Sequence, residues 1–238
     1  MENKRGLIIT QSILKFIKYM AVQFVLFDAI GTTISEKNSK NSIIISSFIA
    51  SFAAENIHLS FEEVNIQRGK SKLEAIKTLL LCKKESLQLS RKIYSEFIAL
   101  LKQHVSEFDE IEGATELFHY LKRKGTQIGL GSGLPEEIIF TICENLNWTE
   151  MFDYIGSSEK LVKGRPDPMM IVEAMKQLKI NNPKLVLKIG DTLADIEEGR
   201  NAGVLTAAVL TGTQDIITLQ TAKPDFIFEN ILGLKTIL

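Results

Sequence analysis

The sequence predicts an α/β protein with a doubly wound, parallel, Rossmann-like core sheet and an inserted α-helical domain. Short apolar runs recur along the chain and alternate with stretches of helical periodicity, which is the pattern of parallel strands and crossover helices. A long interval after the first run shows helical periodicity and no convincing strand. The chain of 238 residues, 45% of them hydrophobic, is long enough for one large α/β domain and a smaller one.

The strands of the predicted sheet are short continuous apolar runs, as expected of strands that are buried on both faces. The first run covers residues 22–27 and is followed by Asp28 and, at Gly31, by a tight loop. Five further runs follow it along the chain: residues 127–130, 152–155, 185–189, 205–210 and 226–228.

The interval between the first two strands predicts a helical cap domain. Apolar residues recur at helical spacing over residues 43–54, 72–81 and 89–101. Ligands of open α/β sheets bind beyond the carboxyl ends of the strands, so an insert that directly follows Asp28 is placed to cover such a site. The predicted organisation is an N-terminal extension at 1–19, a core domain at 20–36 and 106–238, and a helical cap domain at 37–105.

Composition and charge restrict the partners and the compartment. The net charge of -1 carries no basic excess, so we expect no nucleic-acid partner. Lys15 and Lys18 interrupt the apolar N-terminal segment, so we expect no signal sequence and no membrane partner; an amphipathic membrane-surface helix is the weaker alternative. Cys82 and Cys143 have no paired spacing, which indicates packed thiols in a reducing cytoplasm. A homodimer is left open.

Three aspartates are the strongest candidates for a metal site. Asp28 and Asp191 each follow an apolar strand, and Asp195 comes four residues after Asp191. If the two strands are neighbours, Asp28 and Asp191 converge and repel each other unless a cation or a proton lies between them. Carboxylate oxygens suit a hard divalent cation such as Mg²⁺. Taken singly, Asp191 and Asp195 are better explained as caps of the helix that follows them.

Four motifs in one order resemble the haloacid dehalogenase (HAD) superfamily from residue 20 onward. They are DAIGTT at Asp28, GSG around Ser132, KGRPDP around Arg165 and GDTLAD at Asp191. The resemblance implies a HAD-like core and magnesium-dependent hydrolysis. It also implies that Asp28 is the nucleophile and forms an aspartyl-phosphate, which divides hydrolysis into two easier displacements.

The resemblance also assigns the metal and phosphate ligands. Mg²⁺ would be bound by the Asp28 carboxylate, the backbone carbonyl of Ile30 and Asp191, with Asp195 supporting from nearby. The metal would shield the phosphoryl oxygens as the nucleophile approaches. Hydrogen bonds or positive charge for the phosphoryl oxygens would come from Thr32, Ser132, Gly133 and Arg165.

Two positions distinguish this chain within the superfamily. Most of its phosphatases carry a second aspartate two residues after the nucleophile, where this chain has Ile30, and isoleucine transfers no proton. The chain is similar here to phosphonoacetaldehyde hydrolases, in which a cap lysine forms a Schiff base with the substrate aldehyde. The segment RGKSKLEAIKTLL places Lys72 at the matching spacing after Gly69, with Ala75 in place of that branch's histidine. Lys72 must be uncharged to attack a carbonyl, so burial or a cation such as Lys70 must lower its pKa.

The sequence leaves three functions open. The first is a phosphonatase-like hydrolase of a small phosphonate or phosphorylated metabolite, with Asp28 as nucleophile, Lys72 as imine former and Mg²⁺ as cofactor. The second is a phosphatase for a small metabolite of the phosphoglycolate or sugar phosphate type. The third is a catalytically weak protein that binds a phosphate ligand.

Overall fold

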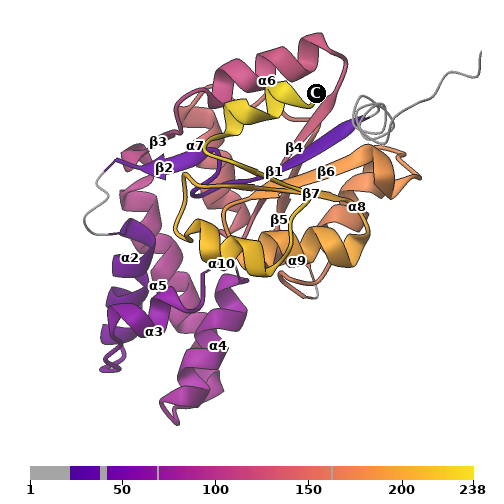
Figure 1. Cartoon of the computed structure of the whole chain (residues 1–238). Coiled ribbons are helices and arrows are strands. Elements are labelled where there is room, and N and C mark those ends of the chain that lie inside the picture. Colours follow the sequence, from indigo (N-terminus) through magenta and orange to yellow (C-terminus); the bar gives the residue numbers. More distant parts are fainter. Residues whose placement is uncertain (1–21, 38–41, 69, 162) are drawn as a thin grey trace, which may run out of the picture.

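The computed structural model describes residues 22–37, 42–68, 70–161 and 163–238, and its centre is a six-stranded parallel sheet (Figure 1). The strands lie in the order β5-β4-β1-β6-β7-β8, so the chain winds outward from β1 in both directions. All six predicted strands are found, with ends shifted by up to two residues. They are β1 (Phe24–Asp28), β4 (Gln127–Ser132), β5 (Tyr154–Ser157), β6 (Val186–Gly190), β7 (Leu205–Val209) and β8 (Phe226–Phe228).

Helices cover both faces of this sheet, which explains why its strands are apolar throughout. They are α6 (Ala114–Arg123), α7 (Glu136–Asn145), α8 (Met169–Gln177), α9 (Leu193–Ala202) and α10 (Ile216–Thr221). Successive residues of β1 point to opposite faces. Val25 and Phe27 belong to the core cluster of α6 and α7, whereas Phe24 and Leu26 belong to the cluster of α8. The 3-10 helices in the connections are η1 (Leu87–Leu89), η2 (Val105–Glu107), η3 (Ser158–Lys160), η4 (Pro183–Leu185) and η5 (Ile231–Thr236).

A separate two-stranded antiparallel sheet pairs β2 (Ile34–Glu36) with β3 (Phe108–Glu110). β2 follows the loop after Asp28, and β3 precedes α6. Their pairing therefore brings the entry to the helical insert and the exit from it side by side. The sequence did not predict this pair, because three residues are too few for a strand alternation to be recognised.

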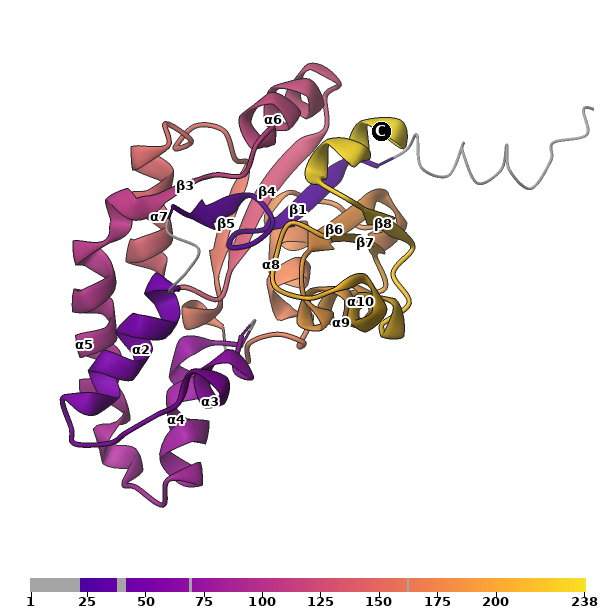
Figure 2. The ribbon, with the colours of Figure 1, turned by 60° about the vertical axis from the view of Figure 1, so that its left-hand side comes forward.

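Between β2 and β3 the described chain forms four α-helices that gather at one end of the sheet (Figures 1 and 2). They are α2 (Ile43–Ala53), α3 (Phe61–Asn65), α4 (Lys72–Cys82) and α5 (Ser90–Gln103). Phe48 of α2 packs edge-on against Phe97 of α5, with ring centroids 4.8 Å apart. The short α3 was not predicted; it begins with a capping box in which Ser60 and Glu63 exchange hydrogen bonds.

The predicted fold class is confirmed, and the described part of the insert is helical as expected. The domain boundaries stay a prediction, and the proposed extension at 1–19 lies outside the described residues. Cys143 is buried, but the expectation of a packed thiol is wrong for Cys82, which is exposed at the end of α4. Within the described ranges, no helix combines the length and apolar character needed to cross a bilayer.

Candidate active site

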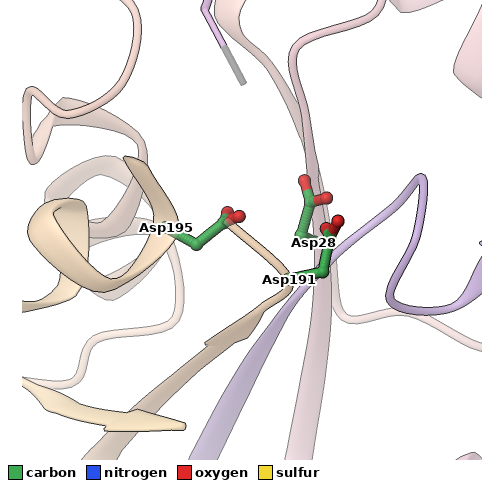
Figure 3. A group of neighbouring side chains, drawn as sticks. All are labelled: Asp28, Asp191 and Asp195. Atoms are coloured by element: carbon green, nitrogen blue, oxygen red, sulfur yellow. The ribbon is translucent and has the colours of Figure 1, made fainter. Parts of the chain in front are cut away.

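Three aspartate carboxylates meet where the central strands of the sheet end (Figure 3). Asp28 is the last residue of β1, and Asp191 directly follows β6, the neighbour of β1. Asp195 lies in the first turn of α9. Each offers a carboxylate oxygen within 4.8 Å of the other two, and all three side chains are buried. The expected convergence of Asp28 and Asp191 is confirmed.

Asp191 is held by neutral hydrogen-bond donors from two loops. Its Oδ1 accepts a hydrogen bond from Thr32 Oγ1 at 3.3 Å, and its Oδ2 accepts one from Thr213 N at 3.0 Å. Gly212 allows the second loop to come this close, because a Cβ at this position would lie 1.9 Å from Asp191 Oδ2. The two loops therefore fix the direction of the carboxylate.

A buried ion network lies beside this carboxylate. Arg165 Nη1 is 2.6 Å from Asp28 Oδ1 and 2.9 Å from Asp195 Oδ1, and its Nε is 3.3 Å from Glu198 Oε2. Lys188 Nζ is 3.0 Å from Asp195 Oδ1 and 3.4 Å from Glu198 Oε2. The charged groups of Arg165 Nε, Lys188 and Glu198 lie close together, but they are not aligned for hydrogen bonds. The network holds the guanidinium against the predicted nucleophile.

Negative charge is in excess in this cluster. The three aspartates and Glu198 are four buried carboxylates, and they face two buried cations. Burial and then the charges of the other two aspartates raise the pKa of Asp191 to about 7. Burial also raises the pKa of Asp28, although Arg165 opposes the shift. Two surplus charges on converging oxygen donors, with no cation of the described chain paired to Asp191, fit a hard divalent metal ion.

A cavity of about 50 Å³ opens over Asp28 and Asp191. Ser132 Oγ accepts a hydrogen bond from Leu134 N at 3.0 Å, so its proton is free to be donated to a ligand. Arg165 Nη2 donates to Gly131 O at 2.8 Å, which fixes the plane of the guanidinium. The cavity therefore offers donors for an anion beside the carboxylate of Asp28. Its lining includes the predicted residues Asp28, Ile30, Lys72, Ser132, Gly133, Arg165 and Asp191.

Two predicted residues lie behind this lining. Thr32 is fully buried, and its hydroxyl is directed to Asp191. Asp195 Oδ2 accepts hydrogen bonds from Thr192 N at 3.2 Å and Thr192 Oγ1 at 2.6 Å. Asp195 is therefore both a cap of α9, as the simpler interpretation predicts, and a member of the acidic cluster.

Lys72 reaches the same cavity from the helical insert. It is the first residue of α4, and this end of the helix docks against the loop that precedes Arg165. There Gly164 N donates a hydrogen bond to Glu74 Oε2 at 3.3 Å, and a Cβ at Gly164 would lie 2.8 Å from Ser71 Cβ. The close approach brings the amine of the insert to the carboxyl edge of the sheet.

The environment of Lys72 makes its amine easier to deprotonate than that of an ordinary lysine. Burial and then the charges of Arg68 and Arg165 lower its pKa to about 8. The sequence predicted that burial or a neighbouring cation such as Lys70 would lower this pKa. In the structure the cations with that effect are Arg68 and Arg165. Lys70 Nζ instead donates a hydrogen bond to Gln67 Oε1 at 3.0 Å. Gly69, on which the spacing argument depended, lies outside the described residues.

The charged and polar residues of this region that the sequence analysis missed include Arg68, Lys188, Glu198 and Thr213. Two of them could have been predicted from the sequence. Lys188 interrupts an apolar strand, and Glu198 follows Asp195 by three residues on the same helix face. Arg68 and Thr213 carried no such signal, since each reaches the cavity only through the packing of distant segments.

A doubly wound sheet with acidic side chains at its carboxyl edge defines a class of α/β proteins whose ligands bind at that edge. The family model described as haloacid dehalogenase-like hydrolase matches residues 25–209. The match covers more than half of the chain and contains the three aspartates. The chain belongs to the haloacid dehalogenase-like hydrolase family.

Similar proteins include phosphonoacetaldehyde hydrolases. The one from Bordetella pertussis is 28% identical over 177 residues, which are 68% of this chain and 64% of that protein. The one from Bacillus cytotoxicus is 25% identical over 211 residues, which are 83% of this chain and 79% of that protein. The chain thus spans slightly less than two thirds of the Bordetella protein. The solved phosphonoacetaldehyde hydrolase like protein from Oleispira antarctica has a TM-score of 0.78 at 20% identity and covers 91% of both chains.

Proposed function

We propose that this protein is a magnesium-dependent, phosphonatase-like hydrolase of a small phosphonate or phosphorylated metabolite. The observation that carries the proposal is the position of Lys72, with a pKa of about 8, on the cavity that also holds Asp28. Ile30 lines the same cavity and transfers no proton, so a phosphate ester would receive no acid from the position two residues after the nucleophile. The similarity to phosphonoacetaldehyde hydrolases supports this choice of chemistry.

Asp28 acts as the nucleophile. Its carboxylate attacks phosphorus, and the carbon–phosphorus bond breaks as the aspartyl-phosphate forms. Water then hydrolyses this intermediate and releases phosphate. Arg165, 2.6 Å from Asp28, and the free proton of Ser132 are placed to donate to the phosphoryl oxygens as negative charge moves between them.

Asp28, the backbone carbonyl of Ile30 and Asp191 would hold Mg²⁺. When bound, the ion supplies positive charge that shields the phosphoryl oxygens from the approaching carboxylate. Thr32 acts through Asp191, whose carboxylate it orients from the side away from the cavity. Asp195 pairs with Arg165 and so keeps the guanidinium beside the nucleophile.

Lys72 activates the carbon side of the substrate. Its neutral amine attacks the carbonyl of the substrate to give a carbinolamine, and uptake of one proton from solvent with loss of water gives a protonated imine. The imine then accepts the electron pair of the breaking carbon–phosphorus bond and becomes an enamine. Protonation at carbon and hydrolysis of the imine release the aldehyde and return the free amine.

A phosphatase of the phosphoglycolate or sugar phosphate type is the second candidate. The observation that favours it is Ala75, which is buried one turn after Lys72 and brings no polar group to the position where the phosphonoacetaldehyde branch has histidine. In that case Asp28 and Arg165 keep their roles, and Lys72 serves as a cation for the substrate.

The test is phosphate release from phosphonoacetaldehyde and from a panel of phosphate monoesters in the presence of magnesium. Phosphonate cleavage that is lost in both Asp28→Asn and Lys72→Arg, with borohydride trapping of substrate on Lys72, supports the imine route. Lys77→Arg is the matched control, because Lys77 is exposed on the same helix. Ester turnover that needs only Asp28 would make the protein a phosphatase. Tight binding of phosphate analogues without turnover would favour the catalytically weak binding protein.

A further inference from the structure

Two cavities meet beside the nucleophile. The inner cavity of about 50 Å³ holds Asp28, Ser132 and the other proposed phosphoryl ligands. A larger cavity of about 310 Å³, here called the outer cavity, adjoins it and is lined by the loops that follow β1 and β7, by the helical insert and by Ile111 after β3. Ile30, Arg68 and Thr213 line both cavities. A substrate whose phosphoryl group occupies the inner cavity and whose remaining part enters the larger one would pass these three side chains.

Arg68 is the cation at this junction, and its hydrogen-bond partner among the described residues is uncharged. Its Nε donates a hydrogen bond to Asn65 Oδ1 at 2.8 Å, a neutral partner that leaves the terminal nitrogens available. No carboxylate of the described residues forms an ion pair with it. Its charge is nevertheless felt inside the site, because it is the largest cause after burial of the lowered pKa of Lys72.

Among the described residues that line the outer cavity, Glu36 is the one acidic side chain, and neutral donors bind it. Its Oε1 accepts hydrogen bonds from Ser42 Oγ at 3.1 Å and from Ile44 N at 3.0 Å, at the start of α2. Arg68 is the only cation among the described residues that line this cavity. Glu36 keeps its negative charge, because its hydrogen-bond donors are neutral, so the described lining of the outer cavity holds one cation and one anion. A singly charged group at Arg68 would therefore leave a smaller excess of negative charge than a second phosphate would.

We propose that Arg68 binds a carboxylate of the substrate, so that the preferred substrates are phosphonates or phosphate esters that also carry a carboxylate. The inference rests on the proposed function, because it takes the inner cavity as the phosphoryl site. The planar guanidinium matches the two oxygens of a carboxylate, which a lysine in its place does not. Either candidate function can use such a substrate, since the contact is remote from the bond that breaks.

The test compares two ligands that differ only in the carboxylate and cannot form an imine. Phosphonoacetate and ethylphosphonate are titrated by calorimetry, with magnesium, into the wild type, Arg68→Met and Arg68→Lys. The wild type should bind phosphonoacetate more tightly by about 10- to 150-fold, the usual range for hydrogen bonds to a charged group. Arg68→Met should remove this preference without changing the affinity for ethylphosphonate, and Arg68→Lys should keep part of it. Lys70→Met, which removes a neighbouring cation that lines neither cavity, should keep the whole preference.

Equal affinities in the wild type, or an equal loss of both ligands in Arg68→Met, would overturn the assignment of Arg68 while leaving the phosphoryl site intact. Failure of the wild type to bind either ligand would remove the phosphoryl site and the role of Arg68 together. Thermal unfolding of each variant shows whether a loss of binding comes from a loss of folded protein.

Discussion

Burial beside Arg68 and Arg165 lowers the pKa of Lys72 to about 8, so the titration of this amine is a direct test of the site. At pH ~7.5 an amine with this pKa is about one quarter neutral, whereas an unperturbed lysine, with a pKa of about 10.4, is about 0.1% neutral. The environment therefore enriches the reactive form about 200-fold. Activity that depends on the imine should rise with pH and level off above pH ~8, because only the deprotonated amine attacks a carbonyl.

The assay is brief acylation over a range from pH ~6 to ~11, followed by peptide mass spectrometry. Access through the cavity limits the absolute rate at which Lys72 is acylated. The measured quantity is therefore the midpoint, the pH at which acylation of Lys72 is half maximal. Exposed Lys77 on the same helix serves as the internal reference for reagent decay. Arg68→Met should move the midpoint upward, since it removes a neighbouring positive charge, and Lys70→Met should not. A midpoint above pH ~10 in the wild type would refute the reasoning.

Three further changes test the site and its support. Gly212→Ala places a Cβ 1.9 Å from Asp191 Oδ2 and should weaken magnesium binding about 10- to 100-fold by calorimetry; unchanged affinity would contradict the assignment of Asp191. Lys188→Met removes one of the two cations that face four buried carboxylates and should cost about 3–5 kcal/mol in urea unfolding, and a loss below ~1 kcal/mol would show that the network is not needed for stability. Phe118→Ala removes a ring with three aromatic neighbours and should cost about 3–5 kcal/mol in the same assay; a smaller loss would mean that the core collapses into the space.

The sequence predicted the site residues whose positions follow from where the apolar strands end. Asp28, Ser132 and Asp191 each lie at the carboxyl end of an apolar run, and parallel pairing of three adjacent strands is enough to bring them together. An error of one or two residues in a strand boundary did not disturb this conclusion. The end of each strand is marked by the change from apolar residues to glycine and polar residues, which is a local signal.

The rest of the site depends on tertiary contacts that leave little trace in the sequence. Thr213 reaches Asp191 because β7 lies next to β6, and Arg68 reaches the cavity because the insert docks against the loop before Arg165. Neither contact follows from the spacing of residues along the chain. Lys188 differs, since a lysine between apolar neighbours in a buried strand requires a buried acid, although not a particular one.

Ile30 and Lys72 make chemical sense as a pair under the proposed mechanism. The buried cluster already holds four carboxylates against two cations, so an aspartate at position 30 would add further repulsion beside the nucleophile. An alkoxide leaving group needs a proton from that position, but a carbon leaving group whose electrons enter an imine does not. Ile30 packs against the apolar core and lines both cavities, so a substrate that reached from the proposed phosphoryl site to Arg68 would pass beside it. Under this mechanism the site has no proton donor at position 30, and cleavage through a Lys72 imine needs none there.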